Sequence, residues 1–325
     1  MTAPLALAVV GAGAMARRRL TALMATGRVR LCGVVARRRQ RAEALASEFG
    51  GAACFDDLDG LAAARPDAVL LEVPHDVQDG LAAAVVARGW HLLVGGPLAT
   101  SLAAGTALTE AAAGRVVVEA GFEARYRPVW ENARALLADG TLGTLVAVQA
   151  TALWAGDPDS WYYDEQASGG MPLTHMTYCF VNPLRWLLGE PSQVAAMSNS
   201  LIHHGGRFVR DETCAALLRF PGDVVASLTA GYVKSAEDGS WRVTLIGHRA
   251  TLDVEPTEMG AGRLRLRHGD SVAETVFPPD CDGFRAQAEA FLDAIAGSGS
   301  VRNPPAECLG DLRVVEAIRG AVVSR

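Results

Sequence analysis

The chain has 325 residues, of which half are hydrophobic, 6% are aromatic and 20% are charged, and its formal net charge is −6. This length exceeds that of one ordinary domain, so we expect two domains, and the small aliphatic residues suit layered α/β packing. The charge is only mildly acidic and no basic stretch alternates with aromatic residues, which argues against nucleic acid as a partner.

Strand and helix patterns alternate through the first third of the chain. Short apolar runs, typical of buried strands, cover residues 5–10, 29–36, 52–55, 67–74, 91–94 and 115–122. Helical patterns separate them: one ends near Thr26, and two more cover 77–88 and 100–113. This alternation predicts right-handed crossovers, a parallel sheet and a ligand site beyond the carboxyl ends of the strands.

After about residue 122 the pattern changes to long alternating strands, preceded by a helix over 130–138. Arginine and leucine alternate over 263–267, which predicts a strand with one solvated face. Turn residues at 221–223 and 268–270 predict two hairpins. Two amphipathic helices close the chain, with apolar faces made by Phe284, Ala288, Phe291, Leu292 and Ile295 and by Leu312, Val315, Ile318 and Val322.

A glycine-rich loop, Gly11-Ala-Gly13-Ala-Met-Ala16, joins the first expected strand to the first helix. Its first glycine allows the tight turn, its second lets the backbone approach a pyrophosphate, and Ala16 keeps helix and strand close. The helix N-terminus then offers N–H groups and a positive dipole end to the phosphates. A plain strand–helix turn is the alternative, but the surrounding βα repeats favour an α/β Rossmann domain over 1–122. Residues 123–325 would then form an α+β domain with an open, mostly antiparallel sheet.

The end of the second expected strand bears on the choice of nucleotide. NAD-binding domains usually carry an acidic residue there for the ribose hydroxyls. Here the position is Ala36, followed by Arg37, Arg38 and Arg39. A carboxylate would repel a 2′-phosphate, whereas guanidinium groups hold one through paired, charge-assisted hydrogen bonds. The sequence therefore favours NADP, and an exposed basic helix start with no cofactor preference is the alternative.

Cysteine usage and hydropathy bear on the cellular compartment in which we expect the protein. The six cysteines are scattered with no Cys-x-x-Cys pair, so neither a zinc site nor a disulfide framework is indicated, and a reduced cytosol fits. The basic residues 17–19 follow the first apolar run instead of preceding it, which is wrong for a signal peptide, and no run is long enough to span a membrane. We expect a cytoplasmic protein without a metal and without membrane contact.

Further motifs extend over nearly the whole chain. They are Pro74, residues 89–99, Gly121-Phe-Glu-Ala-Arg-Tyr-Arg-Pro128, residues 169–190, Asp211-Glu-Thr213 and residues 291–295. With the glycine loop, they make the chain resemble the glucose–fructose oxidoreductase/inositol dehydrogenase/MocA family. The resemblance implies a Rossmann domain plus an open-sheet domain, NAD(P)-dependent oxidation or reduction of sugar-like alcohols and ketones, and a homodimer or homotetramer formed through the open sheet face.

The chain departs from this family at the residues that carry the chemistry. The family's Glu-Lys-Pro lysine, which usually orients the reacting hydroxyl and assists its proton, falls on Gly96, and the glutamate falls on Gly95. In the substrate helix, the usual aspartate is His175 and the usual histidine is Cys179. Hydride transfer is cofactor chemistry, so the proton donor or acceptor is what must be replaced. We expect the space beside Gly96 to hold substrate, water or another residue.

Three residues compete for the proton-handling role. His175 lies one helical turn from Cys179, and thus on the same helix face, and its neutral-range pKa suits proton transfer. Tyr126, in the junction motif, has a phenol that can donate. Lys234, the only lysine, follows a strand end where the family's sheet faces its substrate. The alternatives are a structural histidine bonded to a backbone carbonyl, a tyrosine packed at the hinge and an ordinary solvent-facing lysine.

The glycine loop, the second strand end and the resemblance together give a predicted set of cofactor contacts. They are Gly11, Gly13, Ala14, Met15, Ala36, Arg37, Arg38, Pro74, His75, Gly96 and Pro97. A second set of residues, Trp154, Trp161, Tyr162 and Tyr163, forms either an aromatic wall over a bulky substrate or ordinary sheet packing.

Three functions remain open from the sequence. The first is NADPH-dependent reduction of a C=O group in a small polar metabolite such as a keto-sugar or cyclitol. The second is reduction of a C=N group in a specialised metabolite, since an imine that arrives protonated needs less help from a lysine; the resemblance includes thiazoline reductases of siderophore assembly. The third is a nucleotide-binding sensor or scaffold that has lost its chemistry. Fold alone cannot choose among them, because function resides in the site.

Overall fold

The computed structural model describes residues 3–157, 159–202, 207–232, 240–257, 262–281 and 283–322. The chain forms two compact units. The first unit consists of Met1–Phe122 and Phe284–Leu309, and the second of Glu123–Gly283 and Gly310–Arg325. Lys234 lies outside the described residues.

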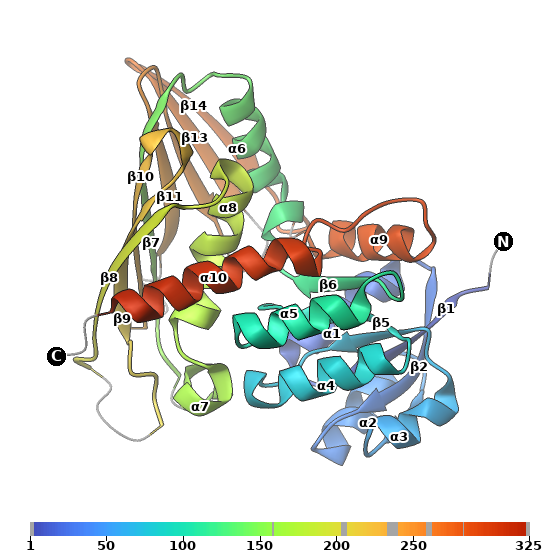
Figure 1. Cartoon of the computed structure of the whole chain (residues 1–325). Helices are drawn as coiled ribbons and strands as arrows, with labels where there is room; N and C mark the ends of the chain where they lie inside the picture. Colours follow the sequence, from blue (N-terminus) through green and yellow to red (C-terminus); the bar gives the residue numbers. More distant parts are fainter. Residues whose placement is uncertain are drawn as a thin grey trace. The chain divides into compact units, whose positions relative to one another are not determined.

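A six-stranded parallel sheet is the centre of the first unit (Figure 1). Its strands are β1 (Leu5–Val10), β2 (Val29–Val35), β3 (Ala53–Phe55), β4 (Ala68–Leu71), β5 (His91–Gly95) and β6 (Val118–Gly121). Their spatial order is β3-β2-β1-β4-β5-β6, so the chain direction across the sheet reverses between β1 and β4. This order confirms the predicted Rossmann domain, whose ligands bind at that reversal, beyond the carboxyl ends of the strands.

Helices connect these strands and cover the sheet. They are α1 (Ala14–Ala25), α2 (Arg39–Glu48), α3 (Leu58–Leu61) with the 3₁₀ turn η1 (Ala62–Ala64), α4 (His75–Ala87) and α5 (Leu102–Ala112). All four residues of β4 are buried, as are five of the six in β1, which is why these strands are continuous apolar runs in the sequence.

Helix α9 (Phe284–Ile295) belongs to the first unit, although it follows the second sheet in the chain. Its apolar residues Phe284, Phe291 and Leu292 join one core cluster with Leu20 and Leu23 of α1. The expected boundary after residue 122 coincides with the border of the units, but the expected single second domain over 123–325 differs from the structure over Phe284–Leu309. The physical reason is that α9 buries its apolar face against α1.

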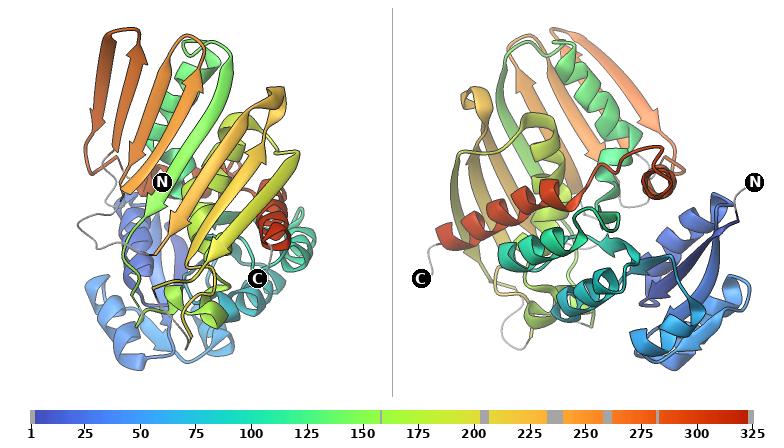
Figure 2. Two further views of the ribbon diagram at one scale, coloured as in Figure 1. Left: turned by 90° about the vertical axis from the view of Figure 1, so that its left-hand side faces the viewer. Right: turned by 45° about the vertical axis from the view of Figure 1, so that its right-hand side comes forward.

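An eight-stranded sheet is the centre of the second unit (Figure 2). Its strands, in spatial order, are β14 (Ser271–Phe277), β13 (Gly262–His268), β12 (Thr251–Pro256), β11 (Ser240–Gly247), β7 (Leu145–Leu153), β10 (Val225–Gly231), β9 (Thr213–Arg219) and β8 (Gln193–Asn199). The recorded pairs are antiparallel except β7 with β10. Both predicted hairpins are confirmed, one through η5 (Pro221–Asp223) and the other between β13 and β14.

Helices cover one face of this sheet. They are η2 (Glu123–Tyr126), α6 (Pro128–Ala138), η3 (Trp161–Tyr163), α7 (Glu165–Ser168), η4 (Pro172–Val181), α8 (Asn182–Leu188) and the part of α10 (Pro305–Ala321) that follows Leu309. The core lies between them and the sheet and includes Trp130, Phe180, Leu228 and Val243. Element η4 is a π-helix of ten residues, a rare form that occurs often at functional sites.

The opposite face of the sheet carries polar and charged side chains. Leu264 of β13 is 4% exposed, whereas Arg263 and Arg267 are about half exposed, as the alternation predicted. Ion pairs cross the strands on this face, including Arg242–Glu255 at 2.6 Å and Arg265–Glu274 at 3.1 Å. In the left view of Figure 2, strands of this sheet lie in front and the second unit's helices lie behind them.

Candidate functional site

The glycine loop lies between β1 and α1, at the reversal of strand order. Gly11 has φ +103°, and a Cβ there would lie 1.9 Å from the backbone oxygen of Glu72, so the turn requires glycine. Around Gly13 no atom lies within 4 Å of the position of a Cβ, so the space beside it is open. Helix α1 begins at Ala14 with no side-chain cap, which leaves the N–H groups of Ala14 and Met15 for an anion.

Alanine substitutions at Gly11 and Gly13 should impair cofactor binding for two different physical reasons. We expect Gly11→Ala to lower the stability of the protein by several kcal/mol, because its methyl group collides with backbone at a left-handed φ. Gly13→Ala should unfold at the same urea concentration as the wild-type protein but bind a nicotinamide dinucleotide at least about tenfold more weakly, because the methyl group enters the open space that a pyrophosphate would need. Urea unfolding and fluorescence titration measure the two effects. Equal stability of the two variants would contradict this account of the loop.

At the end of β2, Ala36 is half-buried and Arg37 and Arg38 are exposed. Arg39, the first residue of α2, pairs with Glu43 at 3.0 Å and with Asp56 at 3.4 Å. Within the described ranges, the side chains of Arg37 and Arg38 form no hydrogen bond or ion pair, although the Arg38 carbonyl oxygen accepts from the N–H groups of Arg41 and Ala42. Two guanidinium groups therefore stand where the adenosine ribose of a dinucleotide is bound, and no carboxylate accompanies them at the strand end.

The ends of β4 and β5 supply the other predicted cofactor contacts. Pro74 precedes α4, and the buried His75 is its first residue. Gly96 and Pro97 follow β5, which pairs with β4, and the peptide bond between them is cis. The Gln78 side chain donates a hydrogen bond of 2.8 Å to the Pro97 carbonyl oxygen. The first unit thus brings the glycine loop, Ala36, Pro74 and Gly96 to the carboxyl edge of one sheet.

The expected space beside Gly96 is occupied by a side chain that the sequence did not identify. A Cβ at Gly96 would lie 2.6 Å from a ring carbon of Phe122, which is 2% exposed. A Cβ at Gly95 would lie 2.8 Å from the carboxylate of Glu72, which forms an ion pair of 2.6 Å with Arg19. Of the three outcomes expected at Gly96, another residue fills the space, and that residue cannot transfer a proton.

His175 lies in the π-helix η4 of the second unit and is fully buried. Its Nε2 is 3.3 Å from the backbone oxygen of Ala152, and its Nδ1 has no hydrogen-bond partner among the described residues. Burial lowers the pKa of His175 to about 3, so the ring is neutral over the physiological range. A neutral ring with Nε2–H donating to a carbonyl leaves the Nδ1 lone pair as a hydrogen-bond acceptor.

Aromatic rings surround His175. Trp154 meets its ring edge-on at a centroid distance of 3.8 Å, and Tyr232 lies at 4.9 Å. Tyr232 also packs against Tyr163 at 4.7 Å, and its hydroxyl lies 3.3 Å from that of Thr174. The sequence did not single out Tyr232 or Thr174, because the contacts join η4 to the residue that follows β10, and the two are far apart in the chain.

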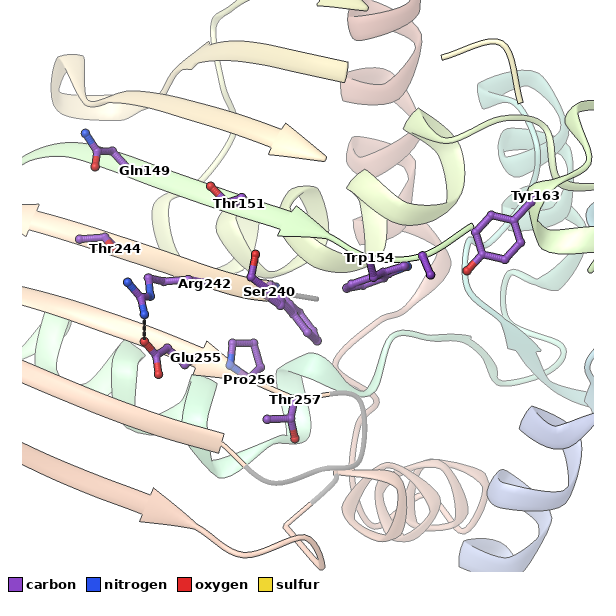
Figure 3. A pocket seen from close by; sticks show the side chains of 12 residues that line it. Gln149, Thr151, Trp154, Tyr163, Ser240, Arg242, Thr244, Glu255, Pro256 and Thr257 are labelled. Atoms are coloured by element: carbon purple, nitrogen blue, oxygen red, sulfur yellow. Dashed lines mark ion pairs between the residues drawn. The ribbon is translucent and has the colours of Figure 1, made fainter. Parts of the chain in front are cut away.

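A pocket of about 890 Å³ adjoins this cluster on the polar face of the sheet (Figure 3). Trp154 and Tyr163 line it and also contact the His175–Tyr232 pair. Strands β7, β11 and β12 supply its polar groups, which are Gln149, Thr151, Ser240, Arg242, Thr244 and Glu255. Trp154 therefore joins the pocket to the buried histidine, and Tyr163 joins it to Tyr232.

The remaining proton-handling candidates are placed as follows. Tyr126 ends η2 in the second unit and is 3% exposed. Lys234 lies outside the described residues, so its role stays a prediction. No group of histidine, cysteine or acidic residues in the described ranges is arranged to hold a metal ion, and the six cysteines are free thiols. Nor is any helix in those ranges both long and apolar enough to cross a membrane.

Comparison with known proteins places both units. Residues 5–121 match the model of the oxidoreductase family with an NAD-binding Rossmann fold, and residues 130–253 match the GFO/IDH/MocA C-terminal domain. The chain is 30% identical over 269 residues to the myo-inositol dehydrogenase Hyg17 of Streptomyces leeuwenhoekii, covering 79% of this chain and 78% of that protein.

Two solved structures share the fold. A levoglucosan dehydrogenase in complex with NADH and levoglucosan superposes with a TM-score of 0.88 at 18% identity, covering 98% of this chain and 97% of that chain. A variant of the 3-ketoreductase KijD10 of Actinomadura kijaniata, in complex with TDP-benzene and NADP, gives 0.87 at 21% identity and covers 98% of each chain. One of these relatives holds NADH and the other NADP.

Proposed function

The chain belongs to the GFO/IDH/MocA family of oxidoreductases, and from that premise we propose that it is an NADP(H)-dependent enzyme that reduces a C=O group of a small polar, sugar-like metabolite. The observation that carries the cofactor choice is the end of β2, where Ala36 replaces an acidic residue and Arg37 and Arg38 are exposed. At that strand end there is no carboxylate to repel a 2′-phosphate. There are instead two guanidinium groups that can bind it.

The cofactor choice predicts a measurable preference. NADPH should bind at least about tenfold more tightly than NADH, and Ala36→Asp with Arg37→Ser should erode or reverse that ratio. Arg39→Ser is the matched control, because Arg39 is engaged with Glu43 and Asp56 and its loss should leave the ratio unchanged. Fluorescence titration of both cofactors gives the ratio, and equal affinities in the wild-type protein would refute NADP as the cofactor.

The pocket of the second unit supports a polyhydroxylated substrate. Trp154 and Tyr163 offer apolar ring surface against which the C–H faces of a sugar or cyclitol can pack. Gln149, Thr151 and Arg242 offer hydrogen-bond donors and acceptors in the same pocket. The similar proteins include an inositol dehydrogenase and a levoglucosan dehydrogenase, and inositol and levoglucosan are both ring compounds rich in hydroxyl groups.

The residues of this chain would bind the cofactor and orient the substrate for hydride transfer. The bound nicotinamide supplies the hydride, and the open space at Gly13 and the free N–H groups of α1 fit its pyrophosphate. The buried ring of His175 supports Trp154 at the wall of the pocket, and this support would orient the substrate ring that carries the reacting carbon. Because His175 is neutral, we assign it this orienting role and not that of a proton donor.

One observation favours a second candidate, the reduction of a C=N group. Phe122 fills the space beside Gly96, so no lysine stands ready to protonate the acceptor atom from that position. An imine can arrive already protonated and needs less help of this kind. Panels of keto-sugars and cyclic imines, each followed by the loss of NADPH fluorescence, separate the two chemistries.

The polar sheet face predicts an oligomer. Met197, Leu217 and Val225 are apolar residues exposed on strands β8, β9 and β10, next to the charged pairs of β11 to β14. We expect the β8 to β10 part of this face, beside the pocket of β7, β11 and β12, to form a homodimer or homotetramer, because its exposed apolar residues are otherwise uncovered. Light scattering at micromolar concentration gives the mass, and a strictly monomeric protein would exclude the assembly.

A further inference from the structure

The pocket of the second unit is elongated along two strands of the sheet. Strands β7 and β11 pair antiparallel beneath it, with Thr151 opposite Arg242 and Gln149 opposite Thr244. Residues that pair directly across two antiparallel strands point to the same face, so these side chains share one floor of the pocket. A strand advances about 3.3 Å per residue, so the floor from Ser240 to Thr244 is about 13 Å long. It therefore extends well beyond the length of a single sugar ring.

The two ends of the pocket differ in chemistry (Figure 3). Trp154, which directly follows β7, and Tyr163 form an aromatic end. Gln149 and Thr244 form a polar end, on the other side of Arg242. Aromatic rings pack against the C–H faces of a sugar, whereas amide and hydroxyl groups bind its hydroxyls. A single ring that packs at the aromatic end therefore leaves the polar end unused.

The volume of the pocket agrees with its length. Pockets for drug-sized molecules have volumes of about 300–1,000 Å³. This pocket has a volume of about 890 Å³, near the upper end of that range. A monosaccharide is much smaller than a drug-sized molecule, whereas two linked sugar rings approach that size. The pocket thus fits a substrate of at least two rings.

The charged side chains of the pocket neutralise each other. Of its lining residues in the described ranges, only Arg242 and Glu255 carry a full charge, and they form an ion pair of 2.6 Å. Arg263, on strand β13, lies between Glu255 and Glu274 at 4.0 and 3.9 Å. A phosphate group beside Arg242 would lie close to the Glu255 carboxylate, which would repel it. The floor therefore favours an uncharged ligand over a nucleoside-diphosphate sugar.

The polar end has hydrogen-bonding groups that no other described residue engages. Gln149 is exposed, and its side chain forms no hydrogen bond within the described ranges. The half-buried Thr151 likewise forms none there through its hydroxyl. Thr244, by contrast, donates a hydrogen bond of 2.7 Å to the Asp253 carboxylate. Because an amide both donates and accepts, Gln149 matches the hydroxyl groups of a second sugar ring.

We propose that the substrate is a neutral glycoside of at least two rings. The ring that carries the reacting carbon packs against Trp154 and Tyr163, and the second ring lies over Arg242 and reaches Gln149. The second ring is bound and not transformed, so its binding energy holds the first ring in place for hydride transfer. The inference deepens the proposed function and rests on it, since it needs a reducible carbonyl group in the first ring.

The test compares ketones that share one reacting ring. The first set consists of the 3-keto derivatives of methyl glucoside, maltose, cellobiose and UDP-glucose, and any other keto-sugar that the protein reduces is paired with its disaccharides in the same way. With NADPH, at least one two-ring ketone should have a kcat/KM about tenfold or more above that of the one-ring glycoside. The UDP-linked ketone should not exceed the neutral two-ring ketone.

Substitutions at Gln149 locate the second ring. Gln149→Leu removes the amide, and Gln149→Trp fills the polar end with a bulky side chain. Each should lower the ratio of the two-ring to the one-ring kcat/KM by about tenfold. Gln193→Leu is the matched control, because it makes the same change at an exposed position of the edge strand β8, outside the pocket. It should change neither value.

Three results would overturn the proposal. They are one-ring ketones reduced as well as their two-ring partners, a ratio that is unchanged in both Gln149 variants, and a UDP-linked ketone reduced faster than the neutral glycosides. A protein that binds NADPH and reduces none of these ketones would instead refute the proposed function.

Discussion

Replacing Gly96 by lysine is expected to destabilise the protein and not to create a more active enzyme. A Cβ at this position lies 2.6 Å from one ring carbon of Phe122 and 2.8 Å from another, closer than van der Waals contact allows. Phe122 is buried, and its backbone oxygen accepts a hydrogen bond of 2.8 Å from the Asn303 side chain, so its ring cannot easily retreat. Overpacking of this kind costs about 1–3 kcal/mol, and the charged end of the lysine adds to it.

A double variant of Gly96 and Phe122 tests whether the loss of stability comes from the steric clash between these two positions. Phe122→Ala alone should cost about 3–5 kcal/mol through the cavity that it leaves. Combined with Gly96→Lys, the loss should be smaller than the sum of the single losses by about 0.5–3 kcal/mol, because the lysine stem enters the vacated space. Urea unfolding gives all four free energies. A single Gly96→Lys variant as stable as the wild-type protein would contradict the assignment of Phe122 to this space.

Removal of His175 is expected to lower turnover strongly while leaving cofactor binding intact. His175→Ala takes away the ring that supports Trp154 at the wall of the pocket. We expect turnover to fall by roughly a hundredfold, with NADPH affinity unchanged because His175 lies in the second unit. Steady-state kinetics measures the turnover, and a fluorescence titration measures the NADPH affinity. Full activity in the variant would make His175 structural and leave Tyr126 as the next candidate.

The same residue makes an acid-sensitive contribution to stability. The folded state holds His175 at a pKa of about 3, against 6.5 when exposed, so below pH 6.5 the unfolded chain binds the extra proton and the folded state does not. Stability therefore falls as the pH falls from 6.5 toward 3, by about 2 kcal/mol between pH 7 and about pH 5 from this group alone. His175→Leu should remove that part of the pH dependence in urea unfolding. An identical pH dependence in the variant would argue against the buried, neutral ring.

The first sheet was predictable because its strands are short apolar runs and its glycine loop is a motif that can be recognised from adjacent residues alone. Residues 5–10 and 91–94, for example, form β1 and most of β5. The placement of α9 was not predictable in this way. Its amphipathic pattern shows that one face is buried, but only the folded chain shows that Phe284 and Phe291 meet α1 and not the second sheet.

The predicted cofactor residues lie at one edge of the first sheet, whereas the contacts around the predicted substrate residues were not predicted. The sequence drew attention to Gly96 and His175, but the surroundings of both are made by partners distant in the chain, Phe122 and Ala152. The spacing of His175 and Cys179 was interpreted with the period of an α-helix, whereas η4 is a π-helix, in which the Thr177 hydroxyl donates to the Pro172 carbonyl oxygen five residues back.

The central claim is that this chain uses NADPH to reduce a polar, sugar-like carbonyl compound. The most direct measurement follows the loss of NADPH fluorescence when the purified protein meets a panel of keto-sugars and keto-cyclitols, with NADH in parallel and the Gly13→Ala variant as the cofactor-binding control. The account predicts oxidation of NADPH by at least one member of the panel, slower oxidation of NADH and almost none by the variant. A protein that binds NADPH tightly and yet never oxidises it, with these ketones or with cyclic imines, would contradict the claim.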